Sequence, residues 1–219
     1  MFTVAGIMAA LLAREKTGRG QYVDVSMTDG VLALMASLFS AYQISGKPPR
    51  RAGQPTNGAT PYYNVYECAD GKYISLGVVE PRFWEELCKG LDRPDLLPLQ
   101  DKTEEYPRIR DEFTRIFKQR TRDEWWDHLK HFDICLGKVL DFEELADDPQ
   151  LQARGMILEV QDEQGNTYRQ VSSAFNLSDT PPTIRRLAPE RGAHTDEALA
   201  QAGFSADEIA RLRRDGTVA

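Results

Sequence analysis

The first sixteen residues, Met1–Lys16, restrict the possible folds more than any other segment. Alanine, leucine and methionine dominate this stretch, which predicts a helix that stops at Gly18 and Gly20. The segment has no capping residue and no polar first turn, and few of its positions can face water. A helix that is apolar nearly all round is normally buried by neighbours on several sides. We therefore expect a larger domain to surround this helix, with other elements preceding it, so that the chain is a truncated form.

The same apolar run resembles a signal peptide or a short membrane span at first sight. Its positive charges, Arg14 and Lys16, follow the apolar residues instead of preceding them. The run is also too short to cross a bilayer. We therefore expect neither secretion nor membrane insertion.

The composition is that of an ordinary globular protein, with 41% hydrophobic and 28% charged residues. A length of 219 residues allows one substantial core or two small ones. The net charge of −7 disfavours nucleic acid and anionic membranes as partners. The three cysteines have no regular close spacing and predict no disulfide framework, so we expect a cytoplasmic protein.

The residues after the first helix are predicted to form a short strand, a second helix and a linker. Gln21–Ser26 has the alternation of a short strand, and Met27–Ser45 is expected to be a helix that Thr28 or Asp29 caps and Gly46 ends. The basic stretch 47–61, rich in proline and glycine, predicts an exposed connection between two units.

The clearest local pattern is a hairpin at residues 62–80. Two β-rich runs, Tyr63–Cys68 and Tyr73–Val79, flank an Asp70-Gly71 pair that suits a type I′ turn. The following Pro81 favours an extended conformation at Glu80, which places this residue between the second strand and a helix.

The remaining elements are predicted from periodicity and turn residues. We expect helical segments within 106–130, a short strand turning into a helix at 139–145, a second hairpin from 156–160 and 168–171, a proline-rich linker after it and two short C-terminal helices. Ser205 and Glu208 form a predicted capping box before the last helix.

Residues with catalytic or metal-binding chemistry are sparse. The sequence contains no glycine-rich nucleotide motif, no P-loop and no Gly-x-Ser-x-Gly elbow. His128, His131 and Cys135 have spacings that could present metal ligands, but no second cluster completes a site. Two ordinary histidines on a solvated helix are the commoner explanation, and we expect no metal. His194 is interpreted as part of a helix entry.

Glu80 is the best catalytic candidate by its context. A carboxylate that follows an apolar strand is unusual unless a partner binds it or it meets solvent. It could orient a histidine, or burial could raise its pKa. The commoner alternative is an exposed residue in the first turn of a helix, where the helix dipole favours negative charge.

Several segments together resemble family III CoA-transferases, the CaiB/BaiF group that includes α-methylacyl-CoA racemase. They occur in the family's order and cover nearly the whole chain, and the surroundings of Glu80 are most similar to the racemase branch. The matching segments are Gly18–Met27, Pro61–Gly71, Val79–Phe83, Asp148–Met156, Leu177–Pro181, His194–Glu197 and Ser205–Ile209.

The resemblance implies an α/β fold with a large Rossmann-like domain and a smaller α+β domain, here without its N-terminal part. It also implies a homodimer in which two chains interlock as linked rings. Residues 1–46 would be a remnant of the large domain and 47–64 a linker. Residues 65–155 would form the small domain, and 156–219 a C-terminal linker and a segment that returns to the large domain.

The resemblance further implies chemistry on an acyl-CoA substrate without another cofactor. In the racemase branch a histidine and an aspartate exchange the α-proton of the thioester, and a glutamate supports the histidine; Glu80 matches that glutamate. In the transferase branch an aspartate attacks the acyl-CoA instead. The aspartate falls just before the helix at Met1 and the histidine further upstream, so we expect this chain to be inactive alone. Met27, Tyr63 and Val79 would line the acyl pocket.

Two segments depart from the racemase pattern and keep alternatives open. Asn57–Thr60 has fewer glycines than the racemase branch, and Cys135–Lys138 replaces a Cys-Val-Thr-Pro sequence. Epimerisation of 2-methylacyl-CoA thioesters is the first hypothesis. The alternatives are CoA transfer to a carboxylic acid, and a non-catalytic subunit that interlocks with a longer relative.

Overall fold

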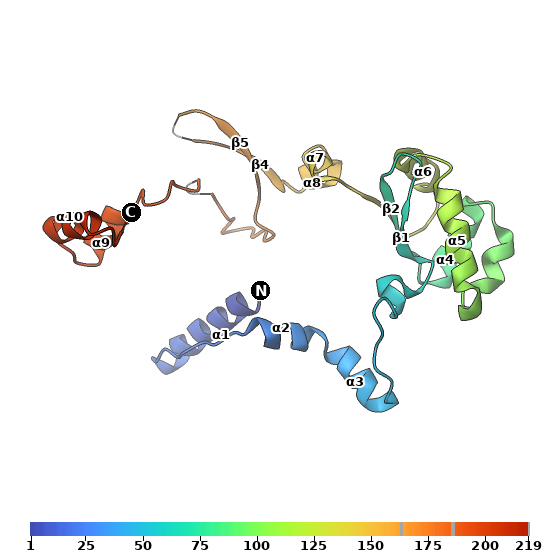
Figure 1. The fold of residues 1–219 in the computed structure, drawn as a ribbon, viewed down its shortest axis with the longest axis horizontal. Coiled ribbons are helices and arrows are strands. Elements are labelled where there is room, and N and C mark those ends of the chain that lie inside the picture. The colour runs from blue at the N-terminus through green and yellow to red at the C-terminus, as the bar shows by residue number, and fades with distance from the viewer. Residues whose placement is uncertain (163, 185–186, 219) are drawn as a thin grey trace. The chain divides into compact units, whose positions relative to one another are not determined.

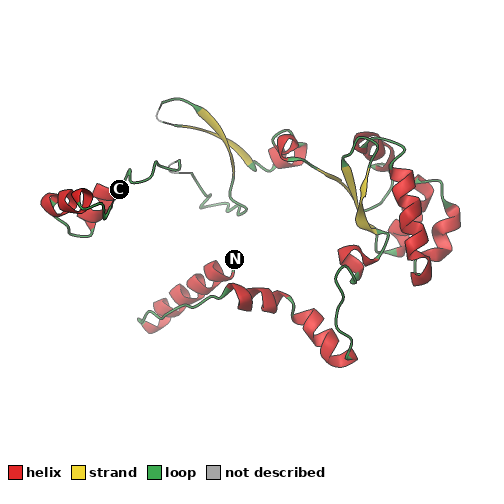
Figure 2. Ribbon diagram, in the orientation of Figure 1, coloured by secondary structure: helices red, strands yellow, loops and turns green. Residues whose placement is uncertain are grey.

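The computed structural model describes residues 1–162, 164–184 and 187–218 as a mixed α/β chain (Figures 1 and 2). The chain forms two compact units, of which the first is Met1–Val139 and the second begins at Leu140. The expected domain ranges stay a prediction, because they assign parts of the chain to the large and small domains of a longer protein. No helix in the described ranges is long and apolar enough to cross a membrane.

The first helix, α1 (Phe2–Thr17), confirms the expected element and its end. Gly18 adopts a left-handed conformation with φ of 70°, and its N–H donates to the Arg14 carbonyl. Residues 21–26 pair with no strand in the part of the chain that the structure describes, so the predicted strand is wrong. They lie along α1 instead: a Cβ atom placed on Gly6 would meet Val23 at 3.2 Å and Val25 at 3.6 Å.

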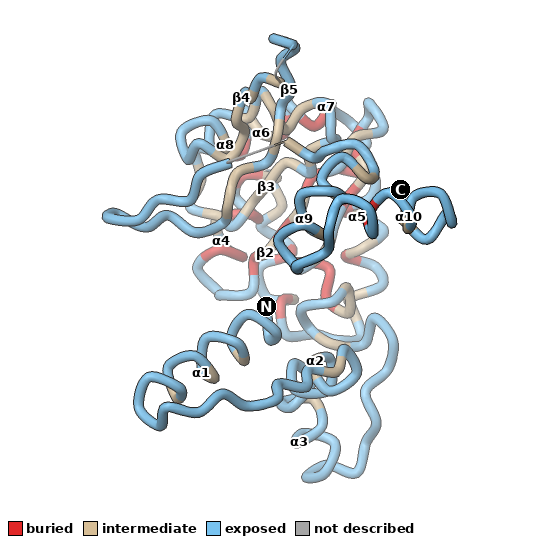
Figure 3. The backbone as a smooth tube through the Cα atoms, turned by 90° about the vertical axis from the view of Figure 1, so that its left-hand side faces the viewer, coloured by how far each residue is buried: buried red, intermediate tan, exposed pale blue. Residues whose placement is uncertain are grey.

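The expected second helix is divided into α2 (Met27–Leu34) and α3 (Ala36–Ser45) by a break at Met35. Ser26 is the cap, since its hydroxyl oxygen accepts a hydrogen bond from the Asp29 N–H, and the prediction of Thr28 or Asp29 as cap is wrong. Helices α1, α2 and α3 contain no buried residue (Figure 3), and the burial expected for α1 is therefore not found among the described residues.

A three-stranded antiparallel sheet follows, made of β1 (Tyr63–Glu67), β2 (Tyr73–Gly77) and β3 (Leu136–Val139) in the order β1-β2-β3. The hairpin between β1 and β2 confirms the predicted pair of strands. Its turn is not type I′, because Gly71 is the one turn residue with a positive φ, at 78°. The Gly71 N–H donates to the Cys68 carbonyl and the Cys68 N–H to the Lys72 carbonyl, which is a turn closed by a left-handed glycine.

Three helices cover one face of this sheet: α4 (Pro81–Gly90), α5 (Tyr106–Phe117) and α6 (Arg122–Leu129). Short 3₁₀ turns at Pro94–Leu99 and Thr103–Glu105 join α4 to α5. Most of the buried residues gather here (Figure 3), and the rings of Tyr66 and Phe117 stack at 5.2 Å between centroids. The core residues include Tyr66, Ile74, Leu76, Trp84, Leu87, Ile109, Phe113, Phe117, Trp125 and Leu129.

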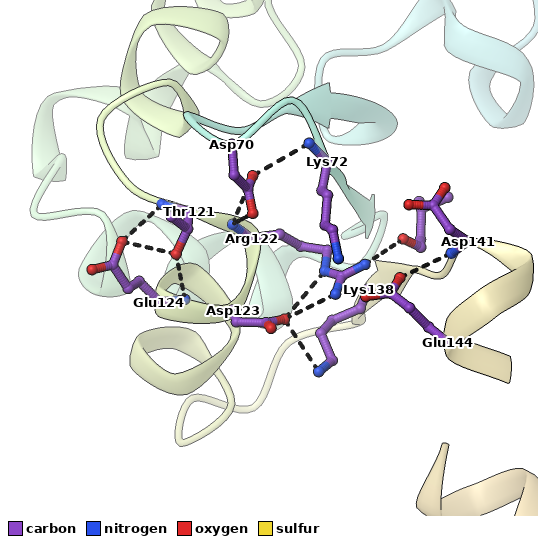
Figure 4. A network of polar contacts seen from close by, with 10 residues as sticks. Asp70, Lys72, Thr121, Arg122, Asp123, Glu124, Lys138, Asp141 and Glu144 are labelled. Carbon is purple, nitrogen blue, oxygen red and sulfur yellow. Dashed lines mark hydrogen bonds and ion pairs between the residues drawn. The ribbon is translucent and has the colours of Figure 1, made fainter. Parts of the chain in front are cut away.

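Arg122 ties the start of α6 to the end of β3 (Figure 4). Its side chain is 1% exposed, and its Nη1 donates to the Val139 carbonyl at 2.9 Å. Its Nη2 also meets Asp123 at 3.1 Å, and Lys138 binds the same carboxylate oxygen at 3.3 Å. Burial acts to raise the pKa of Asp123, but the hydrogen bonds from Lys138 and Arg122 outweigh it and hold that pKa below its ordinary value.

The second unit consists of short elements. Two short helices, α7 (Phe142–Leu145) and α8 (Pro149–Ala153), precede an antiparallel hairpin of β4 (Ile157–Gln161) and β5 (Thr167–Val171). The hairpin and the helix start within 139–145 were predicted, whereas α8 was not. At the C-terminal end lie α9 (Thr195–Gln201) and α10 (Ala206–Arg214), which an ion pair between Asp196 and Arg213 joins at 2.9 Å. The predicted Ser205–Glu208 capping box is confirmed.

Candidate functional site

The face of the sheet opposite the helices carries a hollow of about 580 Å³. Side chains alternate along each strand, so Tyr66 and Ile74 enter the core while Val65 and Ser75 face the hollow. The strand pairing brings the hollow-facing residues into register, because Tyr63 lies opposite Gly77 and Ser75 opposite Gly137.

Two glycines make this face concave. A Cβ atom on Gly77 would lie 3.6 Å from the Cβ of Cys135 and 3.7 Å from the Tyr63 ring, and one on Gly137 would lie 3.0 Å from the Ser75 hydroxyl. Side chains at these positions would therefore occupy the space of the hollow. Glycine inside a strand often marks a place where a ligand or another backbone approaches closely. The Ser75 hydroxyl donates to the Gly137 carbonyl at 3.1 Å.

A turn at Pro55–Ala59, called the Gly58 turn below, borders the hollow with Thr56, Asn57 and Gly58. Gly58 has a φ of 100°, a conformation that residues with a Cβ atom rarely adopt. The Asn57 side chain accepts a hydrogen bond from the Gln54 N–H at 2.8 Å. Residues 57–59 of this turn belong to the stretch whose sequence departs from the racemase pattern.

Glu80 lies three residues beyond the end of β2, at the N-cap of α4. Its backbone is extended, with φ of −72° and ψ of 139°, as Pro81 predicts. Its carbonyl accepts from the N–H groups of Phe83 and Trp84, while its exposed carboxylate has no hydrogen-bond or ion-pair partner among the described residues. The carboxylate is therefore available to a group outside the helix.

The backbone next to Glu80 is fixed by a long-range hydrogen bond. The buried side chain of Gln100 donates from Nε2 to the Val79 carbonyl at 2.8 Å. One residue earlier, the Val78 N–H donates to the Tyr62 carbonyl at 2.9 Å. These contacts hold the end of the strand in place and leave the side chains of Val79 and Glu80 exposed.

The other predicted site residues fall in two places. Tyr63 is 36% exposed and lines the hollow, and Val79 is 42% exposed, two residues after Gly77. Met27 is 90% exposed on α2 and lines a separate depression with Val31 and Met35. The structure thus gathers Tyr63 and Val79 near one strand end and gives no contact that joins Met27 to them.

The three cysteines differ sharply in accessibility. Cys68 and Cys88 are buried, and burial raises the pKa of Cys68 to about 11 and that of Cys88 to about 12. Cys135 is exposed and lines the hollow. A thiol reagent will therefore report on the hollow through Cys135.

One of the histidines considered as a metal ligand, His128, contacts the backbone of the fold. The Nε2 atom of His128 lies 2.8 Å from the Gly90 carbonyl, in hydrogen-bonding range. In the described ranges no group of three or more histidine, cysteine, aspartate or glutamate side chains is placed to hold a metal ion.

Reasoning from the sequence missed the hollow. The sequence places Ser75 and Gly77 only in a predicted strand, and Gly137 only in a segment that departs from the racemase pattern. The available signal was Gly77 inside a predicted strand, because strand glycines weaken a sheet unless close approach requires them. Gly137 gave no such signal, because it precedes the strand predicted from residue 139. The pairing of β2 with β3, which puts the glycines on one face, was not predicted.

Comparison with known proteins gives a consistent result. The chain is 33% identical to α-methylacyl-CoA racemase of Homo sapiens over 211 residues, covering 96% of the chain and 54% of that protein. It is 31% identical to formyl-CoA:oxalate CoA-transferase of Rhodopseudomonas palustris over 241 residues, covering 97% of the chain and 56% of that protein. The chain thus spans about half the length of these relatives.

Solved structures agree on the fold. A CAIB/BAIF family protein from Brucella suis matches with a TM-score of 0.72 at 23% identity, over 91% of the chain and 53% of that protein. The profile of CoA-transferase family III matches residues 1–195. The chain therefore belongs to CoA-transferase family III.

Proposed function

We propose that this chain is part of an enzyme that acts on acyl-CoA thioesters and that its glycine-lined hollow receives the acyl group. The observation that carries the proposal is the hollow itself, about 580 Å³ in volume and bordered by Tyr63, in a chain of CoA-transferase family III. Its lining combines apolar surface with a few polar groups, as ligand sites usually do. Coenzyme A enters as part of the substrate, and we propose no further cofactor.

The proposed reaction is epimerisation of a 2-methylacyl-CoA. A base removes the α-proton, the charge moves onto the thioester oxygen, and an acid returns a proton to the opposite face. We propose that Glu80 accepts a hydrogen bond from the imidazole of the proton-transferring histidine and stabilises its charged form. The free carboxylate of Glu80 at a fixed strand end and the 33% identity to the human racemase support this role.

Transfer of CoA to a carboxylic acid is the second candidate. The 31% identity to formyl-CoA:oxalate CoA-transferase favours it, as do the departures from the racemase pattern at residues 57–60 and 135–138. In this reaction a carboxylate attacks the thioester, CoA leaves, and a second carboxylic acid completes the exchange.

One experiment separates the two reactions. The complete protein is incubated with a 2-methyl-branched acyl-CoA in deuterated water, with and without an added carboxylic acid, and followed by NMR and mass spectrometry. Loss of the α-proton signal without an acceptor supports epimerisation. CoA exchange that needs the acceptor, without loss of the α-proton, supports transfer and contradicts the first proposal.

The acid and base that exchange the proton are proposed to come from regions of the enzyme that the 219 residues do not supply. We accordingly expect residues 1–219 alone to show no turnover in the same assay. Turnover by this chain in pure form would contradict that expectation. Restored turnover only after mixing with a longer relative would support the alternative of a non-catalytic, interlocking subunit.

The assembly and location follow the same proposal. We propose a cytoplasmic homodimer of interlocked chains in which residues 1–46 and 156–219 join a large Rossmann-like domain. Exposed apolar side chains on α1–α3, such as Leu34 and Ile44, support a partner for these helices. Light scattering of the complete protein should give the mass of two chains, and a monomer at micromolar concentration would contradict the assembly.

A further inference from the structure

Arg110 of α5 connects the helices to the Gly58 turn. Its Nη2 donates to the Gly58 carbonyl at 2.8 Å and to the Ala59 carbonyl at 2.9 Å. The neighbouring positions Ile109 and Phe113 are buried in the core, so the stem of Arg110 starts from a rigid part of α5. The guanidinium therefore links the Gly58 turn to helix α5, and turns are in general more mobile than the helices that they adjoin.

The remaining polar atom of this side chain argues against a role in stability alone. The Nε atom of Arg110 is buried and has no hydrogen-bond partner among the described residues. A buried N–H without a partner destabilises the fold, so stability alone would favour an apolar side chain of similar length at this half-buried position. An arginine at this position is explained by its two bonds to the turn.

The turn's other hydrogen bonds close it on itself. The Thr60 hydroxyl donates to the Pro55 carbonyl at 2.9 Å, and the Gln54 N–H donates to the Asn57 side chain at 2.8 Å. Both bonds would move with the turn and do not attach it to α5. The carbonyls that Arg110 holds belong to residues 58 and 59, and Gly58 itself lines the hollow.

We propose that Arg110 is a positioning residue that holds the Gly58 turn as one wall of the hollow and thereby sets which acyl chains fit. The choice of an acyl group as ligand rests on the proposed function, whereas the positioning of the turn does not. A fixed wall discriminates between ligands by their size, because a pocket that cannot widen rejects the longer or more branched chain.

The first arm of the test measures the turn without ligand. Arg110→Met keeps the length of the side chain and removes its donors, Arg110→Lys keeps the charge, and Arg115→Met is the matched control, since Arg115 is an exposed arginine on the same helix. Hydrogen exchange of the Asn57 and Ala59 amides, which both donate to the Gln54 carbonyl, should accelerate at least about 10-fold in Arg110→Met.

The control results make this arm specific. We expect an intermediate rate in Arg110→Lys, the wild-type rate in Arg115→Met, and unchanged exchange of the β1–β2 amides in all variants. Unchanged exchange at Asn57 and Ala59 in Arg110→Met overturns the proposal. If Arg110→Met unfolds, the buried Cys68 and Cys88 will react with a thiol reagent, and Arg110→Lys then decides the question by the same amides.

The second arm measures selectivity through Cys135. The rate of its alkylation is followed as butanoyl-CoA or dodecanoyl-CoA is added, and the ratio of the two half-protecting concentrations is compared between proteins. In Arg110→Met we expect the two half-protecting concentrations to become more alike, so that their ratio changes by at least roughly 3-fold towards one. In Arg115→Met we expect the wild-type ratio.

The two arms fail in different ways. If the turn loosens but neither thioester protects Cys135 in the wild type, the acyl site of the proposed function is wrong and the selectivity role falls with it. If the thioesters protect Cys135 and the ratio is the same in Arg110→Met, the acyl site stands and the role of Arg110 in selectivity is overturned.

Discussion

Glu80 combines a fixed backbone with a free side chain. Gln100 and Pro81 hold the chain on either side of it, yet its carboxylate caps nothing and pairs with nothing among the described residues. Because the carboxylate contributes little to the fold, a substitution of Glu80 can change catalytic activity without a large change in stability.

We predict that Glu80→Gln lowers kcat for α-proton exchange on the order of 100-fold, with a smaller change in KM, because the amide no longer stabilises a charged histidine. The free energy of unfolding should change by less than about 0.5 kcal/mol, since the side chain is exposed. Kinetics and urea denaturation measure the two effects. The control is Glu85→Gln on α4, and equal kcat in both variants would contradict the role of Glu80.

The glycines of the hollow allow a second test at the scale of single residues. Gly77→Val places methyl groups where a Cβ atom already meets Cys135 and Tyr63 at ordinary contact distances, so the strand should tolerate the change. We expect the half-protecting concentration of a long acyl-CoA for Cys135 to rise roughly 10-fold, because one or two added methyl groups occupy the site. Val139→Ala, on the neighbouring strand β3 and outside the lining of the hollow, is the control; equal protection in Gly77→Val would place the acyl chain elsewhere.

Among the elements, those with local signals were predicted best. The helix ended by Gly18, the hairpin at residues 156–171 and the capping box of α10 depend on hydrogen bonds between residues close in sequence. The strand expected at Gln21–Ser26 failed because a strand needs a partner, and extended composition alone does not supply one. The turn at Gly71 differed from type I′ because only one of its residues takes a positive φ.

The β4–β5 hairpin carries a pH dependence of its own. Asp162 accepts hydrogen bonds from the Asn166 side chain, from the N–H groups of Gln164 and Asn166, and from the Tyr168 hydroxyl. These bonds, that from the Asn166 side chain foremost, lower the pKa of Asp162. A lowered pKa means that the carboxylate stabilises the hairpin above the ordinary aspartate pKa of about 3.9 and stops doing so as pH falls through the folded value.

We therefore predict that the Gln164 and Asn166 amide signals titrate with a midpoint below pH of about 3.9, as followed by NMR. Asp162→Asn should abolish this titration and speed hydrogen exchange in the hairpin at neutral pH. Asp207→Asn, at an exposed position of α10, serves as control. A midpoint at or above the ordinary aspartate value would show that the hairpin does not favour the charged form.

At the scale of the whole molecule, most buried residues lie in one part of the described chain, with Ile209 of α10 buried outside it. The sheet β1–β3 and the helices α4–α6 hold the core, whereas α1–α3 contribute no buried residue. The units Met1–Val139 and the one that begins at Leu140 are compact separately, so stability is expected to differ between them.

Phe113→Ala tests this division. Phe113 is fully buried and touches the rings of Tyr66, Trp84 and Phe117, so its removal should lower the free energy of unfolding of the core by about 3–5 kcal/mol. Near-UV circular dichroism in urea reports on the core. Hydrogen exchange in the β4–β5 hairpin should stay the same, and parallel acceleration there would mean that the two units unfold together.

The candidate site was predicted in part. Pro81 after an apolar strand correctly placed Glu80 at a strand end before a helix, because proline restricts the residue before it. The surroundings of Tyr63 were not predicted, since the hollow is completed by β3 and Cys135, which are distant in sequence from β1 and β2. Periodicity identifies which residues share a face of one strand, and it does not identify the neighbouring strand.

The amino-acid sequence by itself determined the helix ends at Gly18 and Gly46, the two hairpins, the capping box of α10 and the backbone conformation of Glu80. Glycine, proline and short polar side chains have this effect because they act on backbone within a few residues. Only the tertiary structure decided that Gly77 and Gly137 share one face, that Gln100 holds Val79 and that Arg110 holds the Gly58 turn. These contacts join residues far apart in the chain, where packing of the core selects the partners and no local signal specifies them.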